Sequence, residues 1–299
     1  GQGLVGLLVT GLLKANGATV RMGSAKLDGA GRVSITDEAL AALIKSSYST
    51  NIKERQDCSS VILDTSGQVV CIGDISHPVH MSSFMFLGSA ILERFPTESI
   101  QEGDVFMVND PYTGGPSHLA DVTFAGPVFH EGELIAFVGN TGHWPDVGGK
   151  APGQCALGDA TEIYQEALRI PPVRLYRAGE LQEEILELVL LNVRDPGDRD
   201  GDIRAHVGSV RLGIRRMQEL VTRYGKDVFR MGMGELLRIS ETKVRHGILQ
   251  LKEGVYEAID YQDDDVDTDE PMPIQVKVTV THTPEPMITL DFTGTGGPA

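Results

Sequence analysis

Cysteine is scarce in this sequence, and no long segment is continuously apolar. The 299 residues contain only three cysteines, Cys58, Cys71 and Cys155, and no Cys-x-x-Cys pair. This usage argues against a disulfide framework and favours reduced thiols in the cytoplasm. The longest apolar stretch, from Leu4 to Leu13, is interrupted by two glycines and a threonine. It is far shorter than the roughly 20 residues that cross a bilayer, so we expect no membrane partner.

Positive charge is also in deficit. The chain has 26 Lys and Arg against 42 Asp and Glu, a formal charge of −16, with no basic cluster interleaved with aromatic residues. A surface of this sign repels phosphate backbones, which argues against a nucleic-acid partner. The phosphate-binding loop, the dinucleotide glycine fingerprint, the Gly-x-Ser-x-Gly elbow and the His-Glu-x-x-His helix are missing as well. We therefore expect these residues not to bind ATP or a dinucleotide themselves.

The remaining composition is that of a globular protein, with 41% hydrophobic residues. Apolar residues at helical intervals predict helices at 36–45, 80–94, 181–191, 202–224 and 234–246. Short apolar runs bounded by turn residues predict strands at 59–63, 68–72, 104–108, 122–129, 133–139, 255–259, 274–280 and 288–292. The predicted fold class is α+β, with a mixed, β-rich N-terminal part, a helical segment and a returning β region.

Four regions are expected along the chain: an unassigned extension at 1–35, an α+β region at 36–178, a helical region at 179–250 and a β region at 251–299. The last predicted strand is followed by a glycine-rich end with nothing to pair against. We expect missing sequence or a second chain to complete that sheet.

Two His-x-x-Asp motifs lie close together, His118 with Asp121 and His143 with Asp146. Both occur in Gly- and Pro-rich segments at predicted strand–loop junctions, where a rigid, irregular backbone can hold a site. Imidazole and carboxylate groups suit Zn²⁺, Mn²⁺ or Fe²⁺. One such motif is also typical of a structural hydrogen-bonded pair, so the spacing leaves both interpretations open.

Two further segments carry candidate ligands. The charged segment 51–57 ends at Asp57, just before a predicted strand. Its spacing favours a solvated helix end with local ion pairs over a third carboxylate in the site. His77 and His80 flank Pro78 beside a Met- and Phe-rich helix, a pattern that favours packing or a role at the helix start.

Taken together, several segments resemble the hydantoinase B/oxoprolinase family, which includes N-methylhydantoinase and oxoprolinase components and the metal-bearing subunits of acetone and acetophenone carboxylases. The resemblance runs from about residue 39 to the end and is carried by 51–57 (NIKERQD), 77–80 (HPVH), 103–112 (GDVFMVNDPY), 114–115 (GG), 118–121 (HLAD), 143–149 (HWPDVGG), 170–172 (IPP) and 291–295 (DFTGT). Two features depart from the family pattern. The loop reads Gly-Gly-Pro-Ser-His where Gly-Gly-Thr-His is more usual, and the chain is similar to only the N-terminal half of a longer subunit.

The resemblance implies one divalent metal, zinc or manganese, with His118, Asp121 and His143 as ligands and Asp57 as a fourth. It thereby reverses the spacing-based interpretation of Asp57. Three other residues become candidates for catalysis: Asp146 and Glu54 to move a proton, and Arg55 to offset phosphate charge.

The resemblance also implies a hydantoinase A-like partner subunit that binds ATP and phosphorylates the substrate carbonyl oxygen. The expected function of this chain is then hydrolysis of the activated cyclic amide, a small molecule, by water whose pKa the metal lowers. An ATP-dependent ketone carboxylase of the acetone or acetophenone type is the alternative. The abrupt C-terminal end also leaves open a non-catalytic assembly scaffold.

Overall fold

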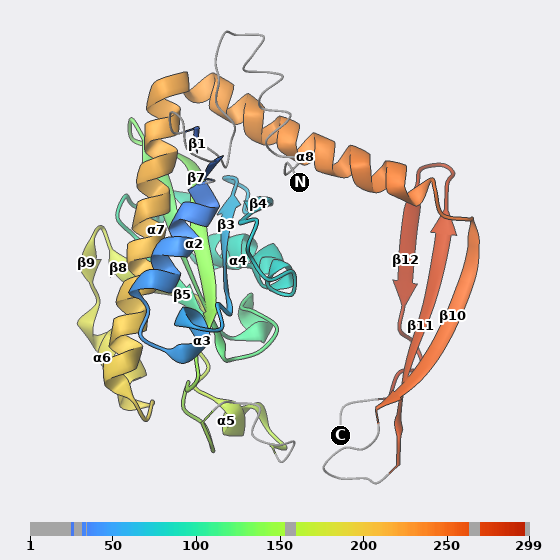
Figure 1. Ribbon diagram of the computed structural model, residues 1–299, viewed down its shortest axis with the longest axis horizontal. Helices are drawn as coiled ribbons and strands as arrows, with labels where there is room; N and C mark the ends of the chain where they lie inside the picture. The colour runs from blue at the N-terminus through green and yellow to red at the C-terminus, as the bar shows by residue number, and fades with distance from the viewer. Residues whose placement is uncertain (1–24, 27–31, 34, 153–159, 263–269, 297–299) are drawn as a thin grey trace. The chain divides into compact units, whose positions relative to one another are not determined.

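The computed structural model describes residues 25–26, 32–33, 35–152, 160–262 and 270–296. These residues form two compact units (Figure 1). The first contains the described residues of Gly1–Gln154 and Tyr164–Leu236, and the second those of Cys155–Ile163 and Leu237–Ala299. Most of the expected 1–35 extension lies outside the described residues, as does the chain end at 297–299. The domain limits expected from the sequence stay predictions.

The first unit is built on a seven-stranded antiparallel sheet with the strand order β4-β3-β7-β6-β5-β8-β9. Its strands are β3 (Cys58–Leu63), β4 (Val69–Ile72), β5 (Val105–Val108), β6 (Asp121–His130), β7 (Glu133–His143), β8 (Val173–Arg177) and β9 (Glu180–Leu181). The two longest strands, β6 and β7, form a hairpin near the middle of the sheet. The predicted α+β class is confirmed.

Helices cover both faces of this sheet. Helix α2 (Ile35–Ser46) lies beside the long helix α7 (Pro196–Tyr224) on one face, and α4 (His80–Arg94) lies on the other (Figure 1). Alternation along β3 divides its side chains accordingly, because successive residues of a strand point to opposite faces. Ile62 joins the core that contains Met217 of α7, whereas Val61 joins the core that contains Phe84 of α4.

Helix α7 begins earlier than the apolar periodicity predicts. Its N-cap is Asp195, whose carboxylate accepts the backbone N–H of Asp198 at 3.3 Å, and Pro196 occupies the first turn. Both features favour a helix start at this point, although the first turns contain few apolar residues. The helix therefore starts at Pro196 and not near Asp202.

Shorter elements complete the first unit: β1 (Ala25–Lys26), β2 (Arg32–Val33), α3 (Thr50–Lys53), η1 (Thr97–Ser99), η2 (Pro111–Thr113) and α6 (Glu183–Leu191), together with α5 (Ile163–Glu166) at the division between the units. Helix α8 (Lys226–Ile248) contributes Phe229, Met233 and Leu236 to the core. Within the described part of the chain, no helix combines the length and the apolar character that a membrane crossing requires.

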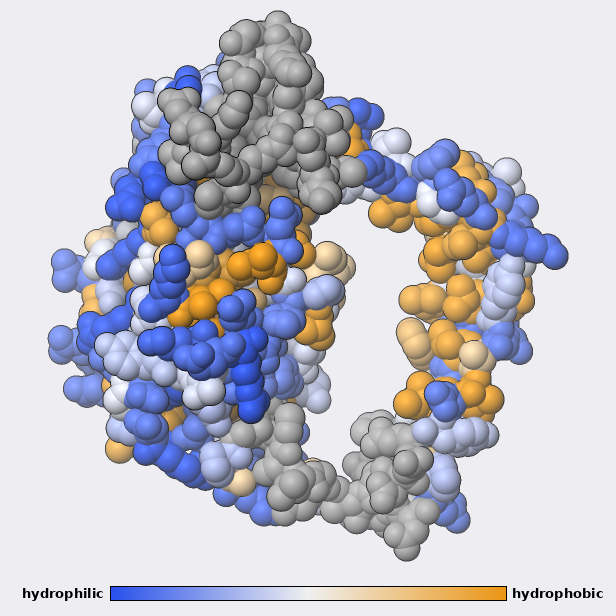
Figure 2. Space-filling model, in the orientation of Figure 1, coloured by the Kyte–Doolittle hydropathy of each residue, from blue (hydrophilic) through white to orange (hydrophobic). Residues whose placement is uncertain are grey.

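The second unit contains a three-stranded antiparallel sheet of β10 (Gly254–Gln262), β11 (Met272–Thr281) and β12 (Met287–Asp291). Apolar side chains gather over these strands (Figure 2). The register pairs Val278 of β11 with Tyr256 on one side and Leu290 on the other, so these three residues share a face. The returning β region expected from the sequence is thus present.

Candidate metal centre

Three neighbouring strands, β3, β7 and β6, bring the candidate ligands together where these strands begin or end. Asp121 opens β6 and His143 closes β7, and the antiparallel register places these two residues directly opposite each other. Asp57 immediately precedes β3, and its carbonyl oxygen accepts the backbone N–H of His143 at 2.9 Å. Strand pairing therefore assembles this group of residues from segments that are far apart in the sequence.

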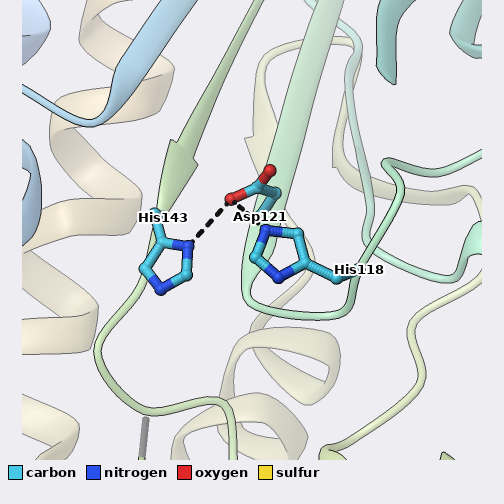
Figure 3. Close-up of side chains that lie close together, drawn as sticks. All are labelled: His118, Asp121 and His143. Carbon is cyan, nitrogen blue, oxygen red and sulfur yellow. Dashed lines mark hydrogen bonds and ion pairs between the residues drawn. The ribbon is translucent and has the colours of Figure 1, made fainter. Parts of the chain in front are cut away.

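The side chains of His118, Asp121 and His143 converge (Figure 3). Oδ1 of Asp121 lies 3.0 Å from Nε2 of His118 and 3.1 Å from Nδ1 of His143. The three potential ligand atoms all lie within 4.8 Å of one another. Two imidazole nitrogens and one carboxylate oxygen form a donor set that suits Zn²⁺, Mn²⁺ or Fe²⁺. The residues present therefore fit the divalent cation that the sequence analysis expects.

The carboxylate of Asp121 is buried but remains ionised. Burial acts to raise its pKa, and the hydrogen bonds with His118 and His143 act to lower it. Together with the charges of the nearby imidazoles, these bonds prevail and hold the pKa of Asp121 well below its usual range. Asp121 therefore offers a negatively charged oxygen at neutral pH.

His80, at the start of α4, belongs to the same constellation. Its ring is buried, with Nε2 3.4 Å from Oδ1 of Asp57 and 3.5 Å from Oδ2 of Asp121. Its Nδ1 lies 2.7 Å from Oγ of Ser59. Burial lowers the pKa of His80 against the opposing effect of the two carboxylates. The sequence pattern favoured packing or a helix-start role; the structure buries His80 at the helix start and surrounds it with polar partners.

The loop that carries His118 is held by Asn109. The side-chain amide of Asn109 donates to the carbonyl oxygens of Leu119 and Leu168, each at 2.9 Å, and its oxygen accepts the N–H of Ile170 at 2.7 Å. Gly115 lies against the same loop, and a Cβ there would stand 2.6 Å from the carbonyl oxygen of Asp110. A larger residue would push this turn apart, which explains glycine just before His118.

The segment after His143 is anchored at two points. Trp144 is fully buried, and its backbone N–H donates to the carbonyl oxygen of Ala120 at 2.8 Å, next to Asp121. Asp146 forms an ion pair with Arg194 at 2.8 Å and accepts the N–H of Gly148 at 3.1 Å. The Asp146 carboxylate is thus engaged with its own loop and with Arg194.

The other predicted site residues lie at the margin of the cluster. Glu54 and Arg55 are exposed at the end of α3, three and two residues before Asp57 in the chain. The Asp57 side chain is 38% exposed, and His80 connects it to Asp121. No motif in the sequence singled out Ser59, Asn109 or Arg194, whose roles depend on contacts between distant segments.

Comparisons with known proteins identify the family and support the fold. Residues 30–299 match the family described as Hydantoinase B/oxoprolinase. The caprolactamase subunit beta of Pseudomonas jessenii is 34% identical over 228 residues, which are 76% of this chain and 38% of that protein. The crystal structure of the ATP-dependent caprolactamase from the same organism superimposes with a TM-score of 0.79 at 30% identity, over 86% of this chain and 44% of that one.

A nucleotide-free acetone carboxylase structure shares the fold, with a TM-score of 0.76 at 19% identity over 87% of this chain and 36% of that one. The chain spans about 40% of the length of three curated relatives, among them the caprolactamase subunit beta, and 16% of the 5-oxoprolinase of Dictyostelium discoideum. The family match covers residues 30–299, which is most of the chain. The chain therefore belongs to the hydantoinase B/oxoprolinase family.

Proposed function

We propose that this chain is the metal-bearing part of an ATP-dependent cyclic amide hydrolase that acts on a phosphorylated substrate. The observation that carries the proposal is the convergence of His118, Asp121 and His143 within 4.8 Å at the end of the β6–β7 hairpin. Asp57 is proposed as the fourth ligand, and the cation as zinc or manganese. The similarity to an ATP-dependent caprolactamase supports this class of reaction.

The proposed division of labour places ATP on a partner subunit of the hydantoinase A type. These 299 residues contain no phosphate-binding loop, and the caprolactamase relative is named as a subunit beta. A second chain or further sequence is proposed to complete the subunit, because the relatives are more than twice as long as the part that matches.

The residues around the site would supply the remaining chemistry. A bound divalent cation would act as a Lewis acid toward the activated carbonyl group. Glu54 is proposed to move a proton and Arg55 to offset phosphate charge, because both are exposed close to Asp57 in the chain. Asp146 is paired with Arg194, which supports a contribution to catalysis through the position of the His143 loop.

The metal assignment is tested by elemental analysis of the purified chain and of two variants. We expect His118→Ala to lose bound metal, because too few protein ligands remain. His130→Ala is the matched control, since His130 lies at the opposite end of β6 from Asp121. Equal metal content in His118→Ala and the wild type would contradict the assignment.

The reaction class requires the assembled complex. A cyclic amide should stimulate ATP hydrolysis by the complex without added bicarbonate. ATP hydrolysis that requires both a ketone and bicarbonate would instead identify the carboxylase branch. A chain with no bound metal in a complex that turns over normally would favour a scaffold.

A further inference from the structure

The buried pair Ser59 and His80 lies behind the candidate metal ligands. Ser59 is in β3 and His80 opens α4, so two different elements bring them together. Ser59 is fully buried, and His80 is 2% exposed. Neither residue belongs to the cluster of His118, Asp121 and His143. Their burial among polar groups requires a satisfied set of donors and acceptors.

The polar neighbours of the His80 ring determine which of its nitrogens carries the proton. Nε2 faces two carboxylates, Asp57 at 3.4 Å and Asp121 at 3.5 Å, and ionised carboxylates only accept hydrogen bonds. A lone pair on Nε2 would oppose both oxygens, so the proton belongs on Nε2. Nδ1 is then an acceptor, and the Ser59 hydroxyl, 2.7 Å away, donates to it.

The same assignment satisfies Ser59. Its Oγ accepts the backbone N–H of His77 at 2.9 Å while its own proton goes to His80. The donors in this series of polar contacts therefore all point the same way, from the His77 N–H through Ser59 to the His80 ring and on to the two carboxylates. Each buried group in this series has a partner of the opposite kind.

We propose that Ser59 and His80 are positioning residues of the metal site, with the Nε2–H of His80 shared between Asp57 and Asp121 so that it sets the orientation of both carboxylates. This inference rests on the proposed metal function. The two oxygens of Asp121 have different partners: Oδ1 contacts His118 and His143, and Oδ2 contacts His80. Loss of the His80 donor would remove this contact from Asp57 and from Oδ2 of Asp121.

The expected effect is weaker binding of the cation with unchanged stoichiometry. Loss of a hydrogen-bond partner behind a metal ligand typically lowers metal affinity about 10- to 100-fold. Removal of a direct ligand leaves too few protein ligands for the cation and lowers the affinity much further. The loss of affinity, compared with that of His118→Ala, therefore distinguishes a positioning residue from a ligand.

The test is a titration of the metal-free 299-residue chain with Mn²⁺, in which electron paramagnetic resonance measures the free ion. His80→Asn can place a polar atom near Ser59 but does not reach the carboxylates, whereas the amide nitrogen of His80→Gln occupies about the position of Nε2. We expect His80→Asn to bind one Mn²⁺ about 10- to 100-fold more weakly than the wild type. His80→Gln should recover affinity to within a few-fold. His130→Ala is the matched control, since His130 lies at the opposite end of β6 from Asp121.

Ser59→Ala provides a second route if the His80 variants do not fold, because it removes one hydroxyl group and keeps the ring. It should weaken Mn²⁺ binding in the same direction, and an unchanged affinity would overturn the proposal. A loss of Mn²⁺ affinity in His80→Asn as large as that in His118→Ala would also overturn it by making His80 a ligand. A wild-type chain that binds no Mn²⁺ or Zn²⁺ would instead contradict the proposed metal function. Binding lost in His118→Ala but unchanged in His80→Asn and Ser59→Ala would contradict this inference alone.

Discussion

The indole N–H of Trp144 donates to Nε2 of His206 over 3.2 Å, and this bond joins the segment after His143 to the buried face of α7. The other ring nitrogen of His206, Nδ1, lies 2.7 Å from Oδ1 of Asn140 in β7. The ring also stacks on Phe124 at 4.5 Å between centroids. His206 therefore holds its proton on Nδ1 and accepts at Nε2, which only the neutral ring can do.

The first prediction concerns the pH dependence of stability. Burial lowers the pKa of His206 to about 3, whereas an unfolded histidine titrates near 6.5. Between these two pKa values the histidine is protonated in the unfolded chain and neutral in the folded chain. The free energy of unfolding therefore falls as the pH drops from about 6.5 towards 3. His206→Gln keeps an acceptor for Trp144 and a donor for Asn140 but cannot titrate. Urea unfolding of the variant should show a shallower loss in this window, by up to about 1.4 kcal/mol per pH unit. Parallel pH curves for the two proteins would contradict the prediction.

The second prediction concerns Asn109. Asn109→Asp replaces two buried donors with an acceptor and directs negative charge at the carbonyl oxygens of Leu119 and Leu168. We expect a loss of about 3 kcal/mol or more in the free energy of unfolding, together with weaker metal binding through the adjacent His118. Asn192→Asp is the control, because its amide makes one exposed hydrogen bond to Leu188. The measurements are urea unfolding and Mn²⁺ titration, and similar losses in both variants would argue against a special role for Asn109.

A third prediction separates two roles for Asp146. Asp146→Asn and Arg194→Gln both break the ion pair that holds the His143 loop. Both variants should retain bound metal, and a double-mutant cycle should give a coupling energy of about 1 kcal/mol, because Arg194 is half-exposed. Both should also reduce turnover of the assembled complex to a similar degree. Turnover abolished in Asp146→Asn and normal in Arg194→Gln would show that Asp146 itself carries the proton.

The fourth prediction compares two helical glycines. A Cβ on Gly88 of α4 would lie 2.3 Å from Cα of Gly67, so the helix packs directly on the β3–β4 turn. Gly88→Ala should therefore lower the free energy of unfolding by at least about 2 kcal/mol, although alanine is the better helix former. Gly208 of α7 is exposed, and none of the described atoms lies within 4 Å of its Cβ position. Gly208→Ala should stabilise the protein by up to about 1 kcal/mol. The same sign for both variants in urea unfolding would contradict this difference.

The sequence predicts local elements better than it predicts pairings. The expected helix at 80–94 coincides with α4, and the strands expected at 59–63 and 68–72 are confirmed by β3 and β4. Strand β8 was not expected, because it follows two prolines at an outer part of the sheet and is defined by pairing with β5. Pairing partners far along the chain leave no local pattern in a single sequence.

The site shows the same difference between local motifs, which the sequence reveals, and contacts between distant segments, which it does not. His118 and Asp121 are three residues apart, so their motif is visible in the sequence. Asp121 lies opposite His143 because of the register of β6 and β7. The sequence predicts the two strands but not this register. The contact of His80 with Asp57 and Asp121 depends on how α4 packs on the sheet. The apolar residues that follow His80 in the sequence indicate packing and give no sign of these polar partners.

The β6–β7 hairpin also limits how this family can vary in length during evolution. Asp121 and His143 face each other at the open end, and the turn at Glu131 and Gly132 lies at the other end, about 30 Å away for a ten-residue strand. Residues inserted at that turn leave the register below it unchanged. One residue inserted within either strand without a compensating bulge would reverse the side chains beyond it and turn a ligand to the opposite face. Natural insertions and deletions should therefore accumulate at the turn and be rare along the paired strands.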